Sequence, residues 1–476
     1  MDRQKRDMGL PPDSTRQLAR WVAGLRYEDL PAATVSSAKR QILDTLAVAW
    51  AGTRAEDIEP LRRFFVRAGG RPEARVWCYD DMLPATQVAF MNAMLAAALD
   101  FDSLHDRANV HSDGVVVPSV FAVADARGAT GAEVVTALVA GSEVMVRLGL
   151  ATRSHPGWFY SSVHGVFGAA IAASKLLNLD ETRTLHAMGI AMSQAAGSQQ
   201  PLLERSLSKR LQTAYAARSG VEAAMFAEAG VTGPAQPLEG SSGVHALYTA
   251  LDPDVLLGGL GVEYEFLGMT FKRYPSCMCN HAPIEATLQL AAGHGLRASY
   301  VDAITVTISP SMHRLTGAPF APGQSPQVSA QFSVRYSVAS ALLRGRFEAA
   351  DIEPAAVLDP AVLSLVSRVV VEVDEAAGRF GPASVSVRTV SGDEHALRLD
   401  SAPGTPSAPL SAADLLTKAK AGFLGAVLPM SAARADALID AVNAFERCAD
   451  ATALLPRQAH EPGPSSLYLP LEVYPS

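Results

Sequence analysis

The sequence predicts a mainly α-helical protein with an α+β insertion: a large helical domain and a smaller α+β lid domain. The first half is rich in Ala, Leu, Val and Gly at helical spacing, and it lacks strand-like alternation between about 30 and 240. Alternating β-branched residues begin only after Gly261. Helical patterning returns after the Pro/Ser-rich stretch "SAPGTPSAPLS" (401–411).

The helices expected in the first half contain small residues on every face, which is typical of helices packed on all sides. They comprise a segment from Pro31 to 53, followed by 84–100, 131–151, 165–179, 182–197 and 209–230. Gly230 is a typical helix stop signal. At 476 residues with 49% hydrophobic side chains, the chain is too long for one compact core, so two domains are expected.

The second half predicts strands interleaved with helices. Strands are expected at 300–310 and 367–375, a hairpin at 383–400, and helices at 281–295, 329–345, 412–425 and 431–447. We therefore predict a discontinuous helical domain (1–267 and 405–476) interrupted by the lid (268–404). The Pro-rich tail 456–476 is expected to lie extended over a surface or a partner chain.

Composition excludes several classes of function. A net charge of −8 without a basic block makes nucleic acid an unexpected partner. Apolar runs are interrupted before the ~18 residues of a membrane span, and no signal peptide is expected. Sparse cysteines suit the cytoplasm, and the C-x-C pair Cys277 and Cys279 lacks zinc-site spacing. No dinucleotide or phosphate loop is present, so neither metal nor cofactor is expected.

The stretch "LDFDSLHDRANVHSDGVVVP" (99–118) places many ionisable groups between two apolar segments. A solvated loop with capping Asp residues would explain any single member. An imidazole close to carboxylates can instead transfer protons near neutral pH. For the cluster together with His111 we favour the second interpretation, because His111 stands at the mouth of a buried segment.

A second stretch, "HPGWFYSSVHGVFGAA" (155–170), places aromatic and hydroxyl side chains directly before a Gly/Ala-rich helix. Ser161 or Ser162 would cap that helix in the ordinary structural interpretation. The functional interpretation makes Tyr160 or His164 an acid or base, beside a helix start that attracts a carboxylate. The residues alone leave both interpretations open.

Two basic stretches complete the candidates. Lys209 begins a helix of small residues, where a basic side chain can simply extend to solvent. Lys272 and Arg273 precede a Pro-containing turn in "GMTFKRYPSCMCNHAPIEA" (268–286), where an ordinary interdomain loop is the alternative.

These stretches, in this order, resemble the MmgE/PrpD family, which includes 2-methylcitrate dehydratases, cis-aconitate decarboxylases and iminodisuccinate epimerase. "DTLAVAWAG", "HGVFGAAIAASKLLNLD", "LEGSSG" and "FKRYPSCMCNHAPIEA" also look like its blocks, and the resemblance covers about 15–450. It implies a helical domain with an inserted α+β lid, acid/base chemistry without cofactor or metal, a small di- or tricarboxylate substrate, and a homodimer.

The resemblance also implies roles for particular residues. The family's active-site Asp falls on Asp100, its first His on His111, and its two Lys on Lys209 and Lys272. The resemblance thus implies that Asp100 orients or tunes His111 in an enclosed cleft. Its lid position that is often His in the decarboxylases is Cys277 here.

One departure concerns the family's second His, which aligns with Phe159. Tyr160 and His164 are the nearby groups that could replace it, and we predict Tyr160 ahead of His164. This departure favours isomerase chemistry, whereas the known members favour lyases.

The sequence thus predicts proton transfer at a carbon next to a carboxylate. Lys209, Lys272 and Arg273, together with Cys277, would contact the substrate, and the lysines would stabilise developing enolate-like charge. Among the possible reactions, a lyase, either dehydratase or decarboxylase, is narrowly the first prediction. The alternatives are an epimerase of a dicarboxylate and a catalytically inactive carboxylate-binding homodimer.

Overall fold

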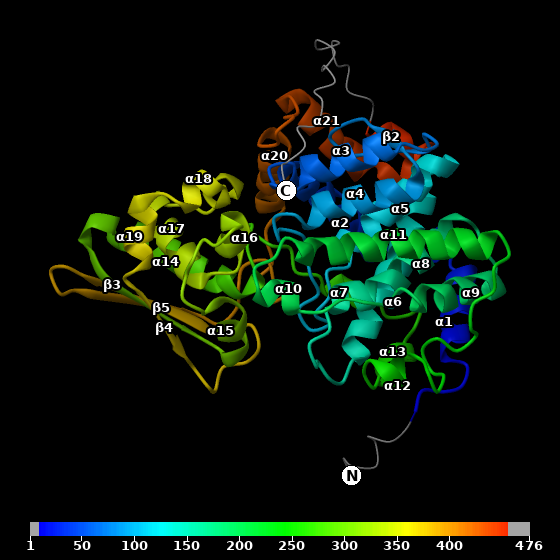
Figure 1. Cartoon of the computed structure of the whole chain (residues 1–476), viewed down its shortest axis with the longest axis horizontal. Helices are drawn as coiled ribbons and strands as arrows, with labels where there is room; N and C mark the ends of the chain where they lie inside the picture. Colours follow the sequence, from blue (N-terminus) through cyan, green and yellow to red (C-terminus); the bar gives the residue numbers. More distant parts are fainter. Residues whose placement is uncertain (1–8, 456–476) are drawn as a thin grey trace, which may run out of the picture.

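The computed structural model describes residues 9–455, so the expected extended tail at 456–476 lies outside the described residues. Figure 1 shows two parts, a large group of helices and, beside it, a smaller group built on a sheet. We call the first the helical body, which comprises α1–α13, α20 and α21. We call the second the α+β unit, which comprises α14–α19 and β3–β6.

The helical body contains fifteen of the described α-helices, from both ends of the chain. They are α1 (Ser14–Gly24), α2 (Ala32–Gly52), α3 (Ile58–Ala68), α4 (Ala85–Ala97), α5 (Asp113–Arg127), α6 (Gly131–Ala151), α7 (Tyr160–Val163), α8 (Gly165–Leu176), α9 (Glu181–Met192), α10 (Gln200–Leu203), α11 (Ser208–Glu228), α12 (Val244–Leu247), α13 (Pro253–Leu257), α20 (Ala412–Leu424) and α21 (Ala432–Asn443).

Small residues let the central helices of the body approach closely. A Cβ added to Gly141 of α6 would lie 2.6 Å from the backbone oxygen of Gly168 in α8, so a side chain there would force the two helices apart. By length and composition α6 could cross a membrane, contrary to our expectation that no apolar run is long enough. However, 94% of its apolar window is buried within the molecule, as in the core helix of a globular body.

The α+β unit is a four-stranded sheet with helices on one face. Its elements are β3 (Val301–Ile308), β4 (Val369–Val373), β5 (Ala383–Thr389), β6 (Glu394–Leu399), α14 (His281–His294), α15 (Pro310–Thr316), α16 (Pro326–Gln331), α17 (Val334–Arg344), α18 (Pro354–Val357) and α19 (Pro360–Val366). The strand order is β4-β3-β5-β6. Only the β3–β4 pair is parallel, because the helices between these strands form the crossover connection.

Alternation along the strands determines which face of the sheet is covered. Ile304, Val306 and Ile308 of β3 are buried, as are Val385 and Val387 of β5. Helix α14 contacts β5 and β6, and α17 contacts β4, on one side of the sheet (Figure 1). The period of two therefore gives the sheet one apolar face for the helices and one polar face for solvent.

The chain passes from the body into the α+β unit and back at neighbouring points. The backbone N–H of Phe271 donates to the carbonyl of Gly404 at 3.1 Å, close to the predicted boundaries. Helix α20 then packs on α2, returning the chain to the body. The lid role of the α+β unit stays a prediction.

Two local expectations are wrong. The segment expected to lack strands contains a short antiparallel pair, β1 (Ala74–Arg75) and β2 (Met82–Leu83), which is too short to show alternation. The helix expected at 329–345 is two helices, α16 and α17, because the Ser333 side chain accepts a hydrogen bond from the backbone N–H of Tyr336 and begins a new helix.

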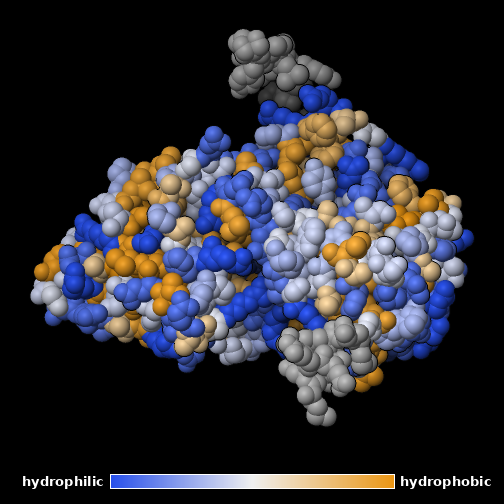
Figure 2. All heavy atoms as spheres, turned by 60° about the horizontal axis from the view of Figure 1, so that its bottom comes forward, coloured by the Kyte–Doolittle hydropathy of each residue, from blue (hydrophilic) through white to orange (hydrophobic). Residues whose placement is uncertain are grey.

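On the face shown in Figure 2, hydrophobic patches of the described residues are small. Hydrophilic residues interrupt them over both parts of the molecule. The hydrophobic side chains are instead concentrated in the interior, where most residues of α4, α5, α6 and α8 are buried.

Candidate active site

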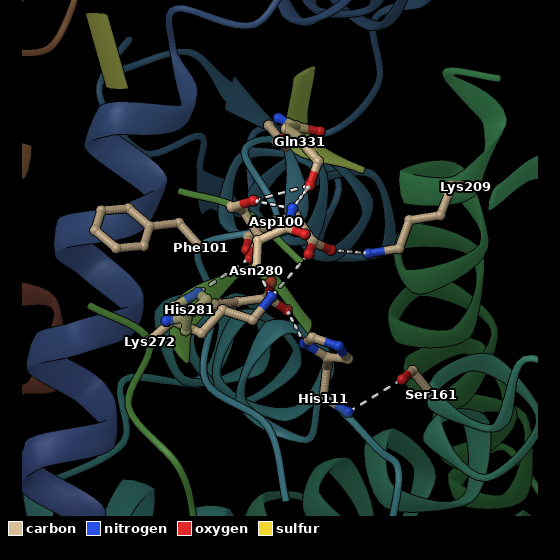
Figure 3. Close-up of polar contacts among 12 residues, drawn as sticks. Asp100, Phe101, His111, Ser161, Lys209, Lys272, Asn280, His281 and Gln331 are labelled. Carbon is tan, nitrogen blue, oxygen red and sulfur yellow. Dashed lines mark hydrogen bonds and ion pairs between the residues drawn. The ribbon is translucent and has the colours of Figure 1, made fainter. Parts of the chain in front are cut away.

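Asp100 is the centre of a buried charged cluster (Figure 3). It lies just after α4 with a left-handed φ of 51°, a conformation that Asp tolerates better than most residues. Lys209, at the start of α11, forms an ion pair with Oδ1. Lys272, from the segment entering the α+β unit, donates to Oδ2 at 2.9 Å and to the Asp100 carbonyl at 2.6 Å. The cluster thus joins the body to the start of the α+β unit.

Burial and pairing act in opposite directions on these groups. The side chains of Asp100, Lys209 and Lys272 are 5%, 8% and 1% exposed. Burial favours a neutral Asp100, but Lys209, Lys272 and His111 outweigh it and hold the pKa of Asp100 well below its usual range. Burial likewise disfavours a charged Lys209, but the carboxylates of Asp100 and Asp102 raise its pKa. We therefore treat Asp100 and Lys209 as charged at neutral pH.

His111 lies next to the cluster, with Asp102 as its direct partner. Its Nδ1 is 3.0 Å from Asp102 Oδ2, and its backbone N–H donates to Ser161 Oγ at 3.0 Å. Burial would raise the pKa of Asp102, but His111 and the two lysines lower it. The expectation that Asp100 orients His111 therefore needs correction, since Asp102 contacts the imidazole while Asp100 holds the lysines.

Aromatic side chains and a thiol surround Lys209. Its Nζ lies 5.5 Å from the centre of the Phe159 ring and 5.7 Å from that of Phe332, within cation–π range. The Cys277 thiol is buried close enough to this cluster that Asp100 and Lys272 act on it. A hydrogen bond from Cys279 and the charge of Lys272 lower the pKa of Cys277 despite its burial.

Gln331 of α16 connects this site to the α+β unit. The side-chain Nε2 of Gln331 donates to the carbonyl of Ala98. The backbone carbonyl of Gln331 accepts from the backbone N–H of Cys277 at 3.0 Å and from Asn280 Nδ2 at 3.1 Å. The position of Cys277 beside Asp100 therefore depends on both parts of the molecule.

Tyr160 and His164 contact each other, but neither side chain takes part in the hydrogen bonds and ion pairs given above for the Asp100 cluster. The Tyr160 hydroxyl donates to the carbonyl of Ser154 at 2.8 Å, and its ring stacks on His164 at 4.7 Å. His164 Nε2 lies 3.0 Å from Thr152 Oγ1. Burial raises the pKa of Tyr160 and lowers the pKa of His164 to about 3, so both are neutral at physiological pH.

Two further expectations differ from the structure. Ser161 and Ser162 do not cap the Gly/Ala-rich helix α8, whose N-cap residue is His164. Both serines lie within α7, where Ser161 accepts from the backbone N–H of His111 and Ser162 donates to the carbonyl of Gln212. Arg273 is not part of the Asp100 cluster. Its guanidinium faces Glu285 and Asp414, at 3.9 and 3.8 Å, on another side of the segment that carries Lys272.

Sequence reasoning missed the roles of three residues. Asp102 stands in the acidic stretch 99–118, where the family motif indicates only its neighbour Asp100. Ser161 stands where a helix cap is the ordinary interpretation, and Gln331 stands in an expected helix without any motif. A pairing between His111 and an acid could have been anticipated from the stretch itself, but contacts over 50 or more positions could not.

The chemistry available to this cluster follows from its donors. An ammonium has three N–H donors, and Lys272 uses two of them on Asp100 while Lys209 uses one. The remaining donors, with His111 beside them, can bind a carboxylate and deliver a proton. Among residues 9–455, no group of three or more His, Cys, Asp or Glu side chains is arranged to hold a metal ion.

Fold and site together define a class of mainly helical, two-part proteins with a buried lysine–carboxylate–histidine cluster where the parts meet. Models of the MmgE/PrpD N-terminal domain and the MmgE/PrpD C-terminal domain match residues 16–254 and 274–444. The chain belongs to the MmgE/PrpD family, as its sequence motifs predicted.

Among its relatives are several cis-aconitate decarboxylases. That of Aspergillus terreus is 29% identical over 303 residues, covering 60% of this chain and 62% of the relative. The Homo sapiens enzyme is 28% identical over 379 residues, covering 75% and 76%. The Mus musculus enzyme is 26% identical over 467 residues, covering 93% of each. The match to the Aspergillus terreus protein thus spans less than two thirds of that protein's length.

Proposed function

We propose that this protein is a lyase acting on a small di- or tricarboxylate, with decarboxylation as its reaction. One observation carries the proposal: three basic side chains meet two neighbouring carboxylates. Lys209 and Lys272 contact Asp100, and His111 contacts Asp102. The names of the relatives support decarboxylation over dehydration. The homodimer and the cytoplasmic location stay predictions.

In the proposed reaction, the unused N–H donors of Lys209 and Lys272 bind a carboxylate that remains on the substrate. The bond to a second carboxylate breaks, CO₂ leaves, and the electron pair stays on the carbon. The ammonium groups stabilise this charge as it spreads toward the bound carboxylate. Protonated His111, held by Asp102, then gives its proton to the carbon.

Cys277 favours epimerisation as the second candidate. Its thiol has a lowered pKa and is the titratable group near Asp100 that replaces the family's lid His. With His111 and Cys277 on opposite faces of a substrate carbon, one would remove a proton and the other would return one. Phe159 cannot take part, since it has no titratable proton.

The test is proton NMR of the full chain with cis-aconitate and a panel of di- and tricarboxylates in D₂O, with CO₂ release measured in parallel. Release of CO₂ with one deuterium in the product supports the decarboxylase. Exchange at the α-carbon without CO₂ supports the epimerase. Binding in a thermal-shift assay without either supports an inactive carboxylate-binding protein. The His111→Asn variant is the control for contaminating activity.

A further inference from the structure

A separate cavity of about 410 Å³ lies where the helical body meets the α+β unit. From the body it is lined by α2, α20 and the Arg54 side chain, and from the α+β unit by the loop after α17 that carries Arg346. Figure 1 shows α20 on the side of the body that faces the α+β unit. This volume falls within the usual range of small-molecule sites, which also occur preferentially between domains.

The cavity lies across the backbone from the Asp100 cluster. Asp100 points into the cluster while the ring of the next residue, Phe101, points the other way (Figure 3) and lines the cavity. Lys272 and Arg273 also point to different sides of the backbone, since Lys272 contacts Asp100 and Arg273 lines the cavity. In both pairs of neighbours, one residue belongs to the Asp100 cluster and the other to the cavity.

Four cationic side chains and two acidic ones, Asp414 and Glu348, line the cavity, and two of the cations have firm partners. Arg54 forms an ion pair with Glu353 and donates to the carbonyl of Gly425. Lys418 lies 2.6 Å from Asp44 and donates to the carbonyl of Phe101 at 3.2 Å. Their charges are therefore largely compensated by acids of the protein itself.

The other two, Arg273 and Arg346, are held loosely. The acidic partners of Arg273 among the described residues lie at 3.9 and 3.8 Å. Arg346 Nε lies 3.6 Å from Glu348 and donates a long hydrogen bond of 3.4 Å to Asp351, which leaves its two terminal nitrogens for other partners. All four distances exceed the 2.7–3.2 Å of a normal N–H···O hydrogen bond. Guanidinium donors therefore remain for a ligand, from Arg273 beside the body and from Arg346 on the α+β unit.

We propose that this cavity is a second ligand site, which binds an organic anion with two acidic groups, one on Arg273 and one on Arg346. A planar guanidinium binds a carboxylate or a phosphate group with two parallel hydrogen bonds, so either group fits. The carbon framework of the ligand packs between Phe101 and Phe347. Such a ligand bridges the two parts of the molecule without touching Lys209 or His111.

The experiment is isothermal titration calorimetry of the full chain with two probes, citrate for the carboxylate arm and adenosine diphosphate for the phosphate arm. The variants Arg273→Gln and Arg346→Gln remove the donors. Because their side chains are 42% and 55% exposed, the variants are expected to fold, which circular dichroism checks. Arg398→Gln is the matched control, an arginine with equally loose partners at 3.9 and 3.6 Å on β6.

We expect at least one probe to bind, with each of the two substitutions weakening its binding roughly ten- to hundredfold. Arg398→Gln and Lys209→Gln should leave this binding unchanged, and the probe that binds identifies the acidic group. The proposal is overturned if neither probe binds at millimolar concentration, or if binding is insensitive to both arginine substitutions. It is also overturned if Lys209→Gln abolishes the binding, because the probe then occupies the Asp100 cluster.

Discussion

The Asp100 cluster and the Tyr160–His164 pair are two buried polar regions predicted to hold acid/base groups, and they differ in what surrounds them. Asp100 is contacted by two ammonium groups and stays ionised although it is buried. His164 is contacted by a hydroxyl and a stacked ring, and burial, followed by the charge of His155, lowers its pKa and keeps it neutral. Burial disfavours the charged form in both regions, and in the Asp100 cluster the opposite charges that face Asp100 outweigh it.

The largest expected effect is on turnover, and it tests which region does the chemistry. His111→Asn removes the proton donor and should lower kcat by roughly 10²–10⁴-fold, the usual contribution of a positioned acid or base. His164→Asn should change kcat by less than about tenfold, because the neutral imidazole contacts Thr152 and Tyr160 and makes none of the contacts described for the Asp100 cluster. Steady-state kinetics on the substrate found in the D₂O panel measures both. An inactive His164→Asn beside an active His111→Asn would reverse the comparison.

Removing the carboxylate that pairs with the Lys209 and Lys272 ammonium groups should lower the free energy of unfolding. Asp100→Asn keeps a residue that tolerates the left-handed φ but removes the countercharge of Lys209 and Lys272. Breaking a buried ion pair costs about 3–5 kcal/mol of unfolding free energy. Urea unfolding at pH 7.5 measures this loss. Asp302→Asn, which removes an exposed partner of Arg388, is the control and should cost less than about 1 kcal/mol.

The burial of a neutral His164 should make the free energy of unfolding depend on pH. The unfolded chain protonates His164 near pH 6.5, whereas the folded chain does so only at about pH 3, so stability falls as pH drops between these values. From pH 7.5 to 5.0 the loss from this residue is about 2 kcal/mol. His164→Asn should remove that share of the pH dependence in urea unfolding. The same slope in variant and wild type would contradict the burial of a neutral His164.

The smallest expected effect concerns Tyr160. Tyr160→Phe loses one hydrogen bond to the carbonyl of Ser154, which also accepts from Thr249 Oγ1. The loss should cost about 1 kcal/mol of stability and leave kcat within about tenfold of wild type. Thermal unfolding and kinetics of the same preparation check both values. If turnover instead falls by roughly a hundredfold or more, Tyr160 acts as an acid or base, as the sequence predicts.

The sequence by itself determined the order and type of most elements. Period-two alternation placed the strands near 300–310 and 367–375, seen as β3 and β4 in one sheet. Helical spacing and the Pro/Ser stretch anticipated the return of the chain at α20. These signals are local, so they can be read without knowing what the segment contacts. The same local view failed at Ser333, where one side-chain hydrogen bond divides an expected helix.

The tertiary structure alone decided the partners. Sequence motifs predicted Asp100, Lys209 and Lys272 as site residues. Which acid faces which base depends on contacts between residues more than 100 positions apart in the sequence. Neighbours in sequence also diverge, since Lys272 contacts Asp100 while Arg273 lines a different cavity. The physical reason is that a group's charge state depends on its burial and on the charges facing it. Both are properties of the folded chain, not of any local pattern.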